Sequence, residues 1–329
     1  MPTITDNIYG KFEFTEPLLI DLYNCAAVQR LGKIHQAGAT YLVKKGRDGN
    51  RLEHSLGVMY LIRILGGSIE EQAAGLLHDI SHTSFSHVID QVFDNRDETF
   101  HEAHKEWLTQ TSGIGKIVEK HGYVLESLLE EEDWKILEQS LPDLCADRID
   151  YTLRDLHGFG LISTDEINHF VQCLSFQQGK IVISDRKIAK WFTEQYFREV
   201  TELFMNPTEI YANNFLASIL KKAHERNIIS VEDMLTENDD KILEKIVDSH
   251  QSDLVASLQI LNPQLTVVAN QKDYEFQGFS KPRFIDPLVL TNGSLQRLSE
   301  LDPDVISMRE EVKSRAVAGV FVKRILSTN

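Results

Sequence analysis

The segment Leu77-His78-Asp79-Ile80-Ser81-His82 joins a histidine directly to an aspartate. Imidazole and carboxylate together suit a borderline divalent cation, and hydrolysis of phosphate esters is work that such a cation does well. The pair closes an apolar stripe with helical spacing, and the partial negative charge at the end of a helix also favours a cation. The segment therefore predicts a metal site at a helix C-terminus.

The residues before this segment predict two antiparallel helices. Ser68, with Glu71 three residues on, predicts a capping box at the start of the helix that leads to His78. The preceding helix is expected over about residues 56–65, where a Gly-Gly pair ends it. A tight connection through these glycines would bring His54, 24 residues earlier on the preceding helix, close to His78.

A second aspartate comes from the segment Asp147-Arg148-Ile149-Asp150-Tyr151. Asp147, Tyr151 and Asp155 recur at four-residue spacing, so they share one face of a helix that is predicted over residues 140–158. Taken alone, this polar stripe is better interpreted as a solvated surface with Arg–Asp pairs. Its order after the His-Asp pair is what makes a ligand role worth considering.

Three further histidines, His82, His87 and His101, follow the His-Asp pair closely in sequence. A lone histidine is more often structural than catalytic, but a group of them beside a predicted metal site is harder to dismiss. Histidine titrates near neutrality and can both contact phosphate and donate a proton.

Composition limits the partners and the compartment. The chain has 329 residues and a formal net charge of −16, so a nucleic-acid partner is not expected, whereas a small anionic substrate requires only local positive charge. Cys25, Cys145 and Cys173 lie far apart, which predicts no disulfide framework and fits a reducing cytosol. The N-terminus has no leader pattern and no apolar run is as long as a membrane span, so a cytoplasmic protein without a membrane partner is expected.

The predicted fold is mainly α, with a small hairpin and a C-terminal α/β appendage. Helices are expected over most of residues 15–260, interrupted by a hairpin at about residues 176–184 that turns at Gln178-Gly179. After about residue 262 the composition shifts to short β-like runs, with a helix predicted at about 305–316 and a strand at 320–325. These signals divide the chain into residues 1–175, a metal-binding catalytic core, 176–262, a helical continuation with the hairpin, and 263–329, the appendage.

Together, the segments resemble the HD-domain phosphohydrolase superfamily. More narrowly, they are similar to the deoxynucleoside triphosphate triphosphohydrolases, including those with a sterile alpha motif. Residues 51–58, Arg-Leu-Glu-His-Ser-Leu-Gly-Val, resemble the Arg-Phe-Glu-His-Ser-Leu-Gly-Val run of that family, and residues 147–155 resemble its Asp-Lys-x-Asp-Tyr-x-x-x-Asp. The resemblance covers roughly residues 15–165. Ser81 replaces a usual glycine, Arg148 replaces a lysine, and no basic regulatory segment is recognisable.

The resemblance implies a role for each candidate residue. One divalent cation (Mn, Fe, Zn, Ni or Mg) would bind to His54, His78, Asp79 and Asp147, and a second Mg could bridge phosphates. His87 would protonate the leaving 5′ oxygen. The other implied roles are orientation of His87 by Asp90, phosphate contacts by His82, His101, Arg51 and Arg148, and sugar contacts by Gln36, Tyr151 and Asp155.

The resulting expectation is a homo-oligomeric enzyme that cleaves deoxynucleoside triphosphates to deoxynucleoside and triphosphate. One alternative is an HD phosphohydrolase of another nucleotide, either a nucleoside monophosphate or a signalling nucleotide. Another is a non-catalytic nucleotide sensor with a structural metal. Spare histidines argue against the sensor, because binding alone needs no proton donor. The sequence fixes neither the preferred base nor the metal.

Overall fold

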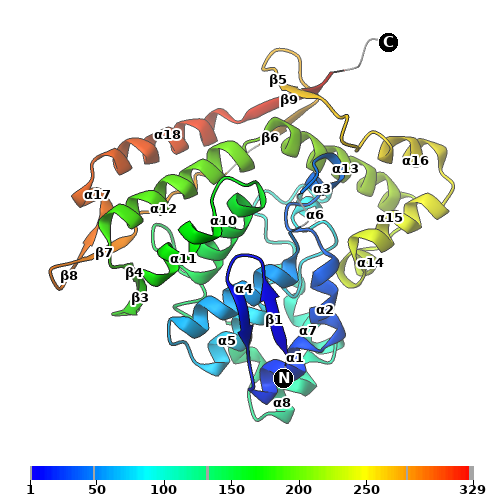
Figure 1. Ribbon diagram of the computed structural model, residues 1–329. Helices are drawn as coiled ribbons and strands as arrows, with labels where there is room; N and C mark the ends of the chain where they lie inside the picture. Colours follow the sequence, from blue (N-terminus) through cyan, green and yellow to red (C-terminus); the bar gives the residue numbers. More distant parts are fainter. Residues whose placement is uncertain (1, 47–48, 131–132, 279–280, 326–329) are drawn as a thin grey trace.

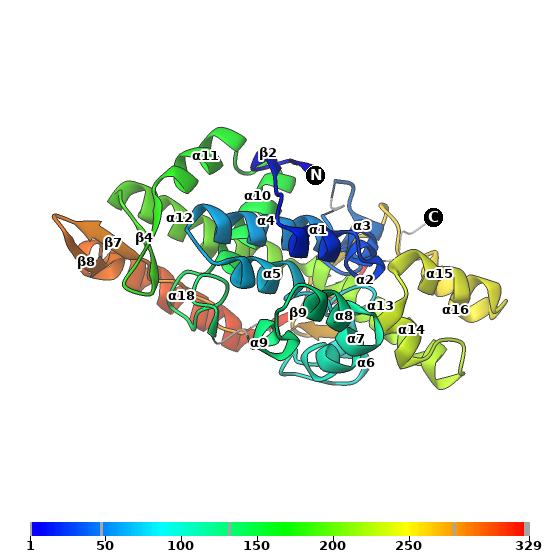
Figure 2. The ribbon, with the colours of Figure 1, turned by 90° about the horizontal axis from the view of Figure 1, so that it is seen from below.

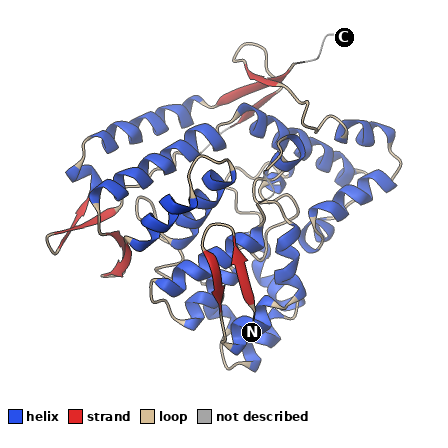
Figure 3. Ribbon diagram, in the orientation of Figure 1, coloured by secondary structure: helices blue, strands red, loops and turns tan. Residues whose placement is uncertain are grey.

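The computed structural model describes residues 2–46, 49–130, 133–278 and 281–325. The protein is mainly helical, and its short strands gather in small sheets at separate places on the molecule (Figure 3). The predicted fold class, a helical HD core with a hairpin and a small C-terminal α/β part, is confirmed. In the described part of the chain, no helix combines the length and the apolarity that a membrane crossing requires.

Helices α4 (Arg51–Ile64) and α5 (Ile69–Leu77) form the centre of the molecule, and α10 (Ala146–Gly158) packs against α4. In Figure 2 the pair lies between α10 and α11 on one side and α7 to α9 on the other. Glycines allow the close packing. A Cβ at Gly75 of α5 would lie 2.4 Å from Ile62, and one at Gly57 of α4 would lie 1.9 Å from Asp150 of α10.

Two helix starts differ from the predictions. Helix α4 begins at Arg51 rather than near residue 56, because the Asn50 side chain accepts a hydrogen bond from the Glu53 N–H and caps it. Helix α10 begins at Ala146 rather than at Ser140. The backbone before it is bonded to distant residues instead, and the Pro142 carbonyl, for example, accepts from the Asp286 N–H.

The predicted capping box of α5 is only half formed. The Ser68 hydroxyl accepts from the Glu71 N–H, as predicted. The Glu71 carboxylate accepts instead from the backbone N–H groups of Ile136 and Leu137. Tertiary donors from a distant loop therefore replace the local one, and they fasten that loop to α5.

An N-terminal hairpin, which the sequence analysis missed, covers the α4–α10 contact. It pairs β1 (Thr3–Asp6) with β2 (Gly10–Glu13). The other elements of the first half are short helices around the central pair (Figure 1): α1 (Pro17–Tyr23), α2 (Ala26–Arg30), η1 (Leu31–Lys33), α3 (Thr40–Val43), α6 (Val88–Val92), η2 (Glu102–His104), α7 (Lys105–Thr111), α8 (Ile114–Lys120), α9 (Leu125–Leu129) and α11 (Thr164–Gln172).

The predicted hairpin is confirmed as β3 (Leu174–Gln177) and β4 (Lys180–Ile183), which pair across Gln178-Gly179. Helices then follow, with a π-helical turn, η4 (Glu199–Phe204), after the first of them. They are α12 (Arg186–Arg198), α13 (Pro207–Glu225), α14 (Val231–Thr236), α15 (Asp239–Asp248) and α16 (Ser252–Leu258).

The segment after residue 262 returns to the middle of the chain. Strand β7 (Leu288–Thr291) pairs parallel to β4 in the order β3-β4-β7-β8, and α18 (Asp304–Ala318) lies along α12 (Figure 1). The remaining elements are β5 (Val267–Ala269), β6 (Phe276–Gly278), β8 (Ser294–Arg297), α17 (Leu298–Leu301) and β9 (Val320–Arg324), with β9 between β5 and β6. The boundaries near residues 175 and 262 stay predictions.

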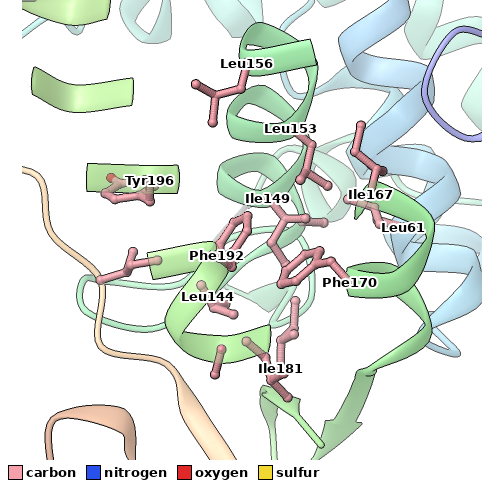
Figure 4. Close-up of a cluster of buried hydrophobic side chains, with 14 of the residues drawn as sticks. Leu61, Leu144, Ile149, Leu153, Leu156, Ile167, Phe170, Ile181, Phe192 and Tyr196 are labelled. Atoms are coloured by element: carbon pink, nitrogen blue, oxygen red, sulfur yellow. The ribbon is translucent and has the colours of Figure 1, made fainter. Parts of the chain in front are cut away.

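A large apolar cluster holds α10 in place (Figure 4). Phe170 of α11 and Phe192 of α12 stack with ring centroids 4.2 Å apart, and both side chains are fully buried. Residues from α4, α10 and β4 complete the cluster, and these include Leu61, Ile149, Leu153, Leu156 and Ile181. Because one face of α10 is fixed in this core, its opposite face presents Asp147 toward α4 and α5.

Candidate metal and phosphate site

Four side chains from three helices converge between α4, α5 and α10. The Nε2 atom of His54 lies 3.2 Å from Nε2 of His78 and 2.9 Å from Oδ1 of Asp147. The Asp79 carboxylate lies 3.7 Å from His54 and 3.5 Å from His78. The structure therefore brings together all four residues that the sequence suggested as metal ligands, and it confirms the predicted proximity of His54 and His78.

The tautomers of the two imidazoles leave their lone pairs facing each other. Nδ1 of His78 lies 2.8 Å from the Gly75 carbonyl, which can only accept, so this nitrogen carries the proton. Nδ1 of His54 lies 2.7 Å from the Asp150 carboxylate and donates to it in the same way. Both Nε2 atoms then point lone pairs at one place, beside carboxylate oxygens. A divalent cation fits this donor set, because neutral imidazole and carboxylate are its usual ligands.

The electric field at this place favours positive charge. Burial disfavours a charged imidazole, yet the bonded carboxylates of Asp147 and Asp150 raise the pKa of His54 to about 10. The same carboxylates would stabilise a bound cation in place of that proton. The side chains of His54, His78 and Asp79 are at most 8% exposed, whereas that of Asp147 is 27% exposed. Water and substrate would therefore approach from the side of Asp147.

A buried chain of charges behind His54 was not found by sequence reasoning. The Asp150 carboxylate accepts from His54 on one side and from Nε and Nη2 of Arg154 on the other, each at 2.9 Å for the arginine. Arg154 in turn lies 3.1 Å from Asp6 of the N-terminal hairpin. The four-residue spacing of Asp150 and Arg154 is the signal that could have indicated the pair. A carboxylate behind a histidine ligand fixes its tautomer and orientation.

Arg51 is held rigidly beside the four donors. Its Nη1 donates to Asp79 Oδ2 at 2.8 Å, and its Nε donates to the Ser86 hydroxyl at 2.9 Å. Although burial opposes ionisation of Asp79, Arg51 and the neighbouring histidines hold the pKa of this carboxyl well below its usual range. Asp79 is therefore an ionised candidate ligand, and one of its oxygens accepts a hydrogen bond from Arg51.

His82, His87 and His101 form a cluster that adjoins Asp79. Nε2 of His82 lies 3.2 Å from Asp79 Oδ1, and its ring stacks on His101 with centroids 3.9 Å apart. Burial lowers the pKa of His82 well below its usual value and that of His101 to about 3, so both imidazoles are neutral. His87 is 44% exposed, and its Nδ1 lies 3.1 Å from Asp90, as the predicted orienting role requires.

The other residues that were predicted to contact the substrate belong neither to the four convergent donors nor to the histidine cluster. Tyr151 lies one helical turn beyond Asp147, with its hydroxyl 3.3 Å from that of Tyr196, and Asp155 lies one turn further on α10. Gln36 has a buried Oε1 for which the described residues offer no hydrogen-bond partner. Arg148 is buried and donates to the carbonyls of Asp143 and Gln139 and to Glu138.

Glu138 is a residue of this region that the sequence analysis did not single out. One of its oxygens, the Cys145 sulfur and an Asp147 oxygen lie within 4.8 Å of one another. Burial, with the negative charge of Asp147 as a further cause, raises the pKa of Glu138 to about 7. No motif marks Glu138, because it comes from the loop before α10 and reaches the site only through tertiary packing.

The four convergent donors generate the first testable prediction. Asp79→Ala and Asp147→Ala should each purify with far less than one metal ion per chain, because each variant loses a charged ligand. Metal content by inductively coupled plasma mass spectrometry measures this, with Asp248→Ala, an exposed carboxylate on α15, as control. Full metal occupancy in both variants would exclude the site.

The buried chain of charges behind His54 generates the second testable prediction. Asp150→Asn should weaken metal binding by about 10- to 100-fold, because an amide holds the His54 tautomer less firmly than a carboxylate does. Competition with a chelator of known affinity measures the change. Asp21→Asn is the matched control, since Asp21 also lies 2.8 Å from a histidine nitrogen, that of His121, but far from the site. Equal metal affinity in the two variants would contradict the role of Asp150.

Comparisons with known proteins agree with this geometry. Residues 51–155 match the HD domain family. The uncharacterized protein YdhJ of Bacillus subtilis is 40% identical over 97% of this chain and 98% of its own length. The metal-dependent phosphohydrolase cns2 of Cordyceps militaris is 37% identical over 63% of this chain and 62% of its own.

More distant relatives include the human deoxynucleoside triphosphate triphosphohydrolase SAMHD1, which is 30% identical over 58% of this chain and 39% of its own. The chain thus spans less than half the length of that relative. A solved phosphohydrolase from Bacteroides thetaiotaomicron has the same fold over the whole of both chains, with a TM-score of 0.76 at 19% identity. From the motif, the converging donors and these relatives together, the chain belongs to the HD-domain family of metal-dependent phosphohydrolases.

Proposed function

We propose that the protein hydrolyses deoxynucleoside triphosphates at the α-phosphate and releases intact triphosphate. The observation that carries the proposal is the unbroken row of polar groups that runs from Asp79 through His82 to His101 and His87. Because imidazole can contact phosphate and donate a proton, this row of side chains beside His54, His78, Asp79 and Asp147 supports the proposal. The SAMHD1 relatives, which are named deoxynucleoside triphosphate triphosphohydrolases, support the substrate class.

The reaction follows from what these side chains can do. His54, His78, Asp79 and Asp147 would hold a divalent cation, and such an ion would supply polarisation of a phosphoryl oxygen and a more nucleophilic water. Arg51 adds fixed positive charge beside the reacting phosphate. As water oxygen bonds to the α-phosphorus, the bond from phosphorus to the 5′ oxygen breaks. His87 gives that oxygen its proton and is restored from solvent, to which it is exposed, while Asp90 holds the ring in place.

The sugar would lie against α10, on the side of Asp147 that is open to solvent. The Tyr151 ring is fixed by packing near Phe204 and by its hydroxyl contact with Tyr196, so it can act as a rigid wall under C2′. A ribose 2′-hydroxyl would clash with such a wall. Asp155 and the buried Gln36 Oε1 are acceptors that suit sugar hydroxyls.

A second candidate is an HD phosphohydrolase of a nucleoside monophosphate or a signalling nucleotide. The observation in its favour concerns Arg148, whose guanidinium is already engaged by Glu138 and by two backbone carbonyls. If Arg148 does not reach the substrate, less positive charge is available to hold a triphosphate. Self-association and a second Mg between phosphates are parts of the proposal supported by resemblance alone, whereas a cytoplasmic location is supported by the three widely separated cysteines.

The proposal predicts the products of a nucleotide screen. With Mn²⁺, Fe²⁺, Zn²⁺, Ni²⁺ or Mg²⁺ supplied in turn, deoxynucleoside triphosphates should yield deoxynucleoside and triphosphate, identified by mass spectrometry. Release of single phosphates, or faster hydrolysis of monophosphates than of triphosphates, would refute the substrate and favour the second candidate.

Two substitutions separate the roles of the proposed side chains. His87→Ala should lower kcat by about 10²- to 10⁴-fold and leave KM nearly unchanged, because a general acid acts on the transition state. Tyr151→Ala should instead raise the rate with ribonucleoside triphosphates relative to their deoxy forms. Steady-state kinetics on paired ribo- and deoxyribonucleotides measures both effects. A large rise in KM for His87→Ala, or an unchanged sugar preference for Tyr151→Ala, would contradict the assignments.

A further inference from the structure

Glu98 lies on the loop between α6 and His101, in the segment that joins His87 to His101. The loop is tied back to Asp90, which lies 3.1 Å from His87: the Asp90 carbonyl accepts from the Asn95 N–H at 2.7 Å, and its carboxylate accepts from the Phe100 N–H at 3.1 Å. Glu98 itself has a left-handed backbone, with φ of +57°. The position of the Glu98 carboxylate is therefore coupled to the part of the site that holds His87.

Two basic side chains from the C-terminal part of the chain form ion pairs with the Glu98 carboxylate. Nη2 of Arg283 lies 2.9 Å from Glu98 Oε2, and Nζ of Lys281 lies 3.3 Å from the same oxygen. Lys281 also donates to the Asp97 carbonyl at 2.7 Å. Both cations come from the segment between β6 and β7, which the sequence analysis left without a function.

Arg283 also lies against the wall of the site opposite the histidines. Its guanidinium is 5.2 Å from the ring centroid of Phe204, and that ring is 6.3 Å from the ring of Tyr151. Arg283 is close enough to influence the ionisation of both Tyr151 and Tyr196. The guanidinium thus stands between the proposed sugar wall and the histidine cluster.

The Glu98 carboxylate is paired with the positive charges of Arg283 and Lys281. Burial raises its pKa, but Arg283, His87 and Lys281 together outweigh that effect and lower it. The place that the carboxylate occupies is therefore favourable for an anion. A phosphate group carries more negative charge than a carboxylate and accepts from guanidinium in the same bidentate manner.

We propose that Arg283 and Lys281 form a binding site for the terminal phosphates of a nucleoside polyphosphate, and that Glu98 occupies this site as an internal competitor. The polyphosphate tail would displace the Glu98 carboxylate, whose side chain is 32% exposed to solvent. The proposal rests on the proposed function in one respect, namely that the substrate is a polyphosphate. It differs from that function in assigning tail recognition to the C-terminal segment rather than to Arg148.

Binding of inorganic tripolyphosphate to the full metal-loaded chain, with Mg²⁺ in excess, tests the proposal by isothermal titration calorimetry. Glu98→Gln should bind tripolyphosphate about three- to tenfold more tightly, because two competing ion pairs are lost. Arg283→Gln should bind it about tenfold or more weakly, because hydrogen bonds to a charged group are lost. Arg283→Lys keeps the charge and should lie between Arg283→Gln and the unaltered protein.

Matched controls come from the same loop and from the surface. Asp94→Asn removes another carboxylate of this loop, which also has a left-handed backbone but pairs with Lys221, at 3.0 Å. Arg226→Gln breaks an exposed pair with Asp253, at 2.8 Å. Both should bind tripolyphosphate as the unaltered protein does. Thermal unfolding of every variant, and metal content after titration, separate loss of the site from loss of fold or of metal.

Three results would overturn the proposal. The first is Glu98→Gln with unchanged or weaker binding, and the second is Arg283→Gln with the same affinity as Arg226→Gln. The third is an equal loss for orthophosphate and tripolyphosphate in Arg283→Gln, since a polyphosphate tail should lose more. The measurement does not depend on turnover. If these affinities shift as expected while deoxynucleoside triphosphates are not hydrolysed, the anion site stands and the substrate assignment fails.

Discussion

The hydrogen bond between His54 and Asp150 is the constraint on which the site depends. It joins α4 to α10 at 2.7 Å, and it exists only because Gly57 lets the two helices approach. This bond fixes the tautomer of His54, so that its Nε2 lone pair faces His78 and Asp147. Arg154 and Asp6 neutralise the buried carboxylate from behind, and they couple the N-terminal hairpin to the same arrangement. Loss of any one member would leave an unpaired buried charge, which costs folding free energy, so the members of this chain of charges depend on one another.

Positively charged groups gather at the site, whereas the molecule as a whole is negatively charged. The chain carries a formal net charge of −16, yet positive groups gather where a phosphate would lie. Arg51 is locked by Asp79 and Ser86, and Arg283 is held by Glu98. His82 and His101 are neutral because burial disfavours their charged forms. A site built in this way can attract a small anion locally, whereas the net negative charge of the chain disfavours long polyanions.

Local signals predicted elements better than they predicted element ends. The Gln178-Gly179 turn and the end of α5 at His78 depend on a few adjacent residues, and both were predicted correctly. The serine and nearby proline at residues 140–142 predict a helix start at Ser140, but the backbone of residues 140–145 bonds to Arg148 and to Asp286 instead. The Glu71 carboxylate likewise accepts hydrogen bonds from the backbone N–H groups of Ile136 and Leu137 rather than from that of Ser68, its partner in the predicted capping box. In both cases a distant donor competed with the local one and prevailed, which no local pattern can reveal.

The sequence by itself determined the helical class, the family and the residues that would meet at the centre, because His54, His78, Asp79 and Asp147 lie in motifs whose order and spacing carry the information. The tertiary structure alone decided what surrounds them. The contact of Asp150 with His54 joins two motifs in a way that neither motif reveals. Glu138 beside Asp147, and Lys281 and Arg283 facing Glu98, come from segments that no motif marks. Such contacts depend on how the C-terminal segment returns through β7 to β4 and on how closely Gly57 lets α10 approach α4, and both follow from packing of the whole chain rather than from any one stretch of it.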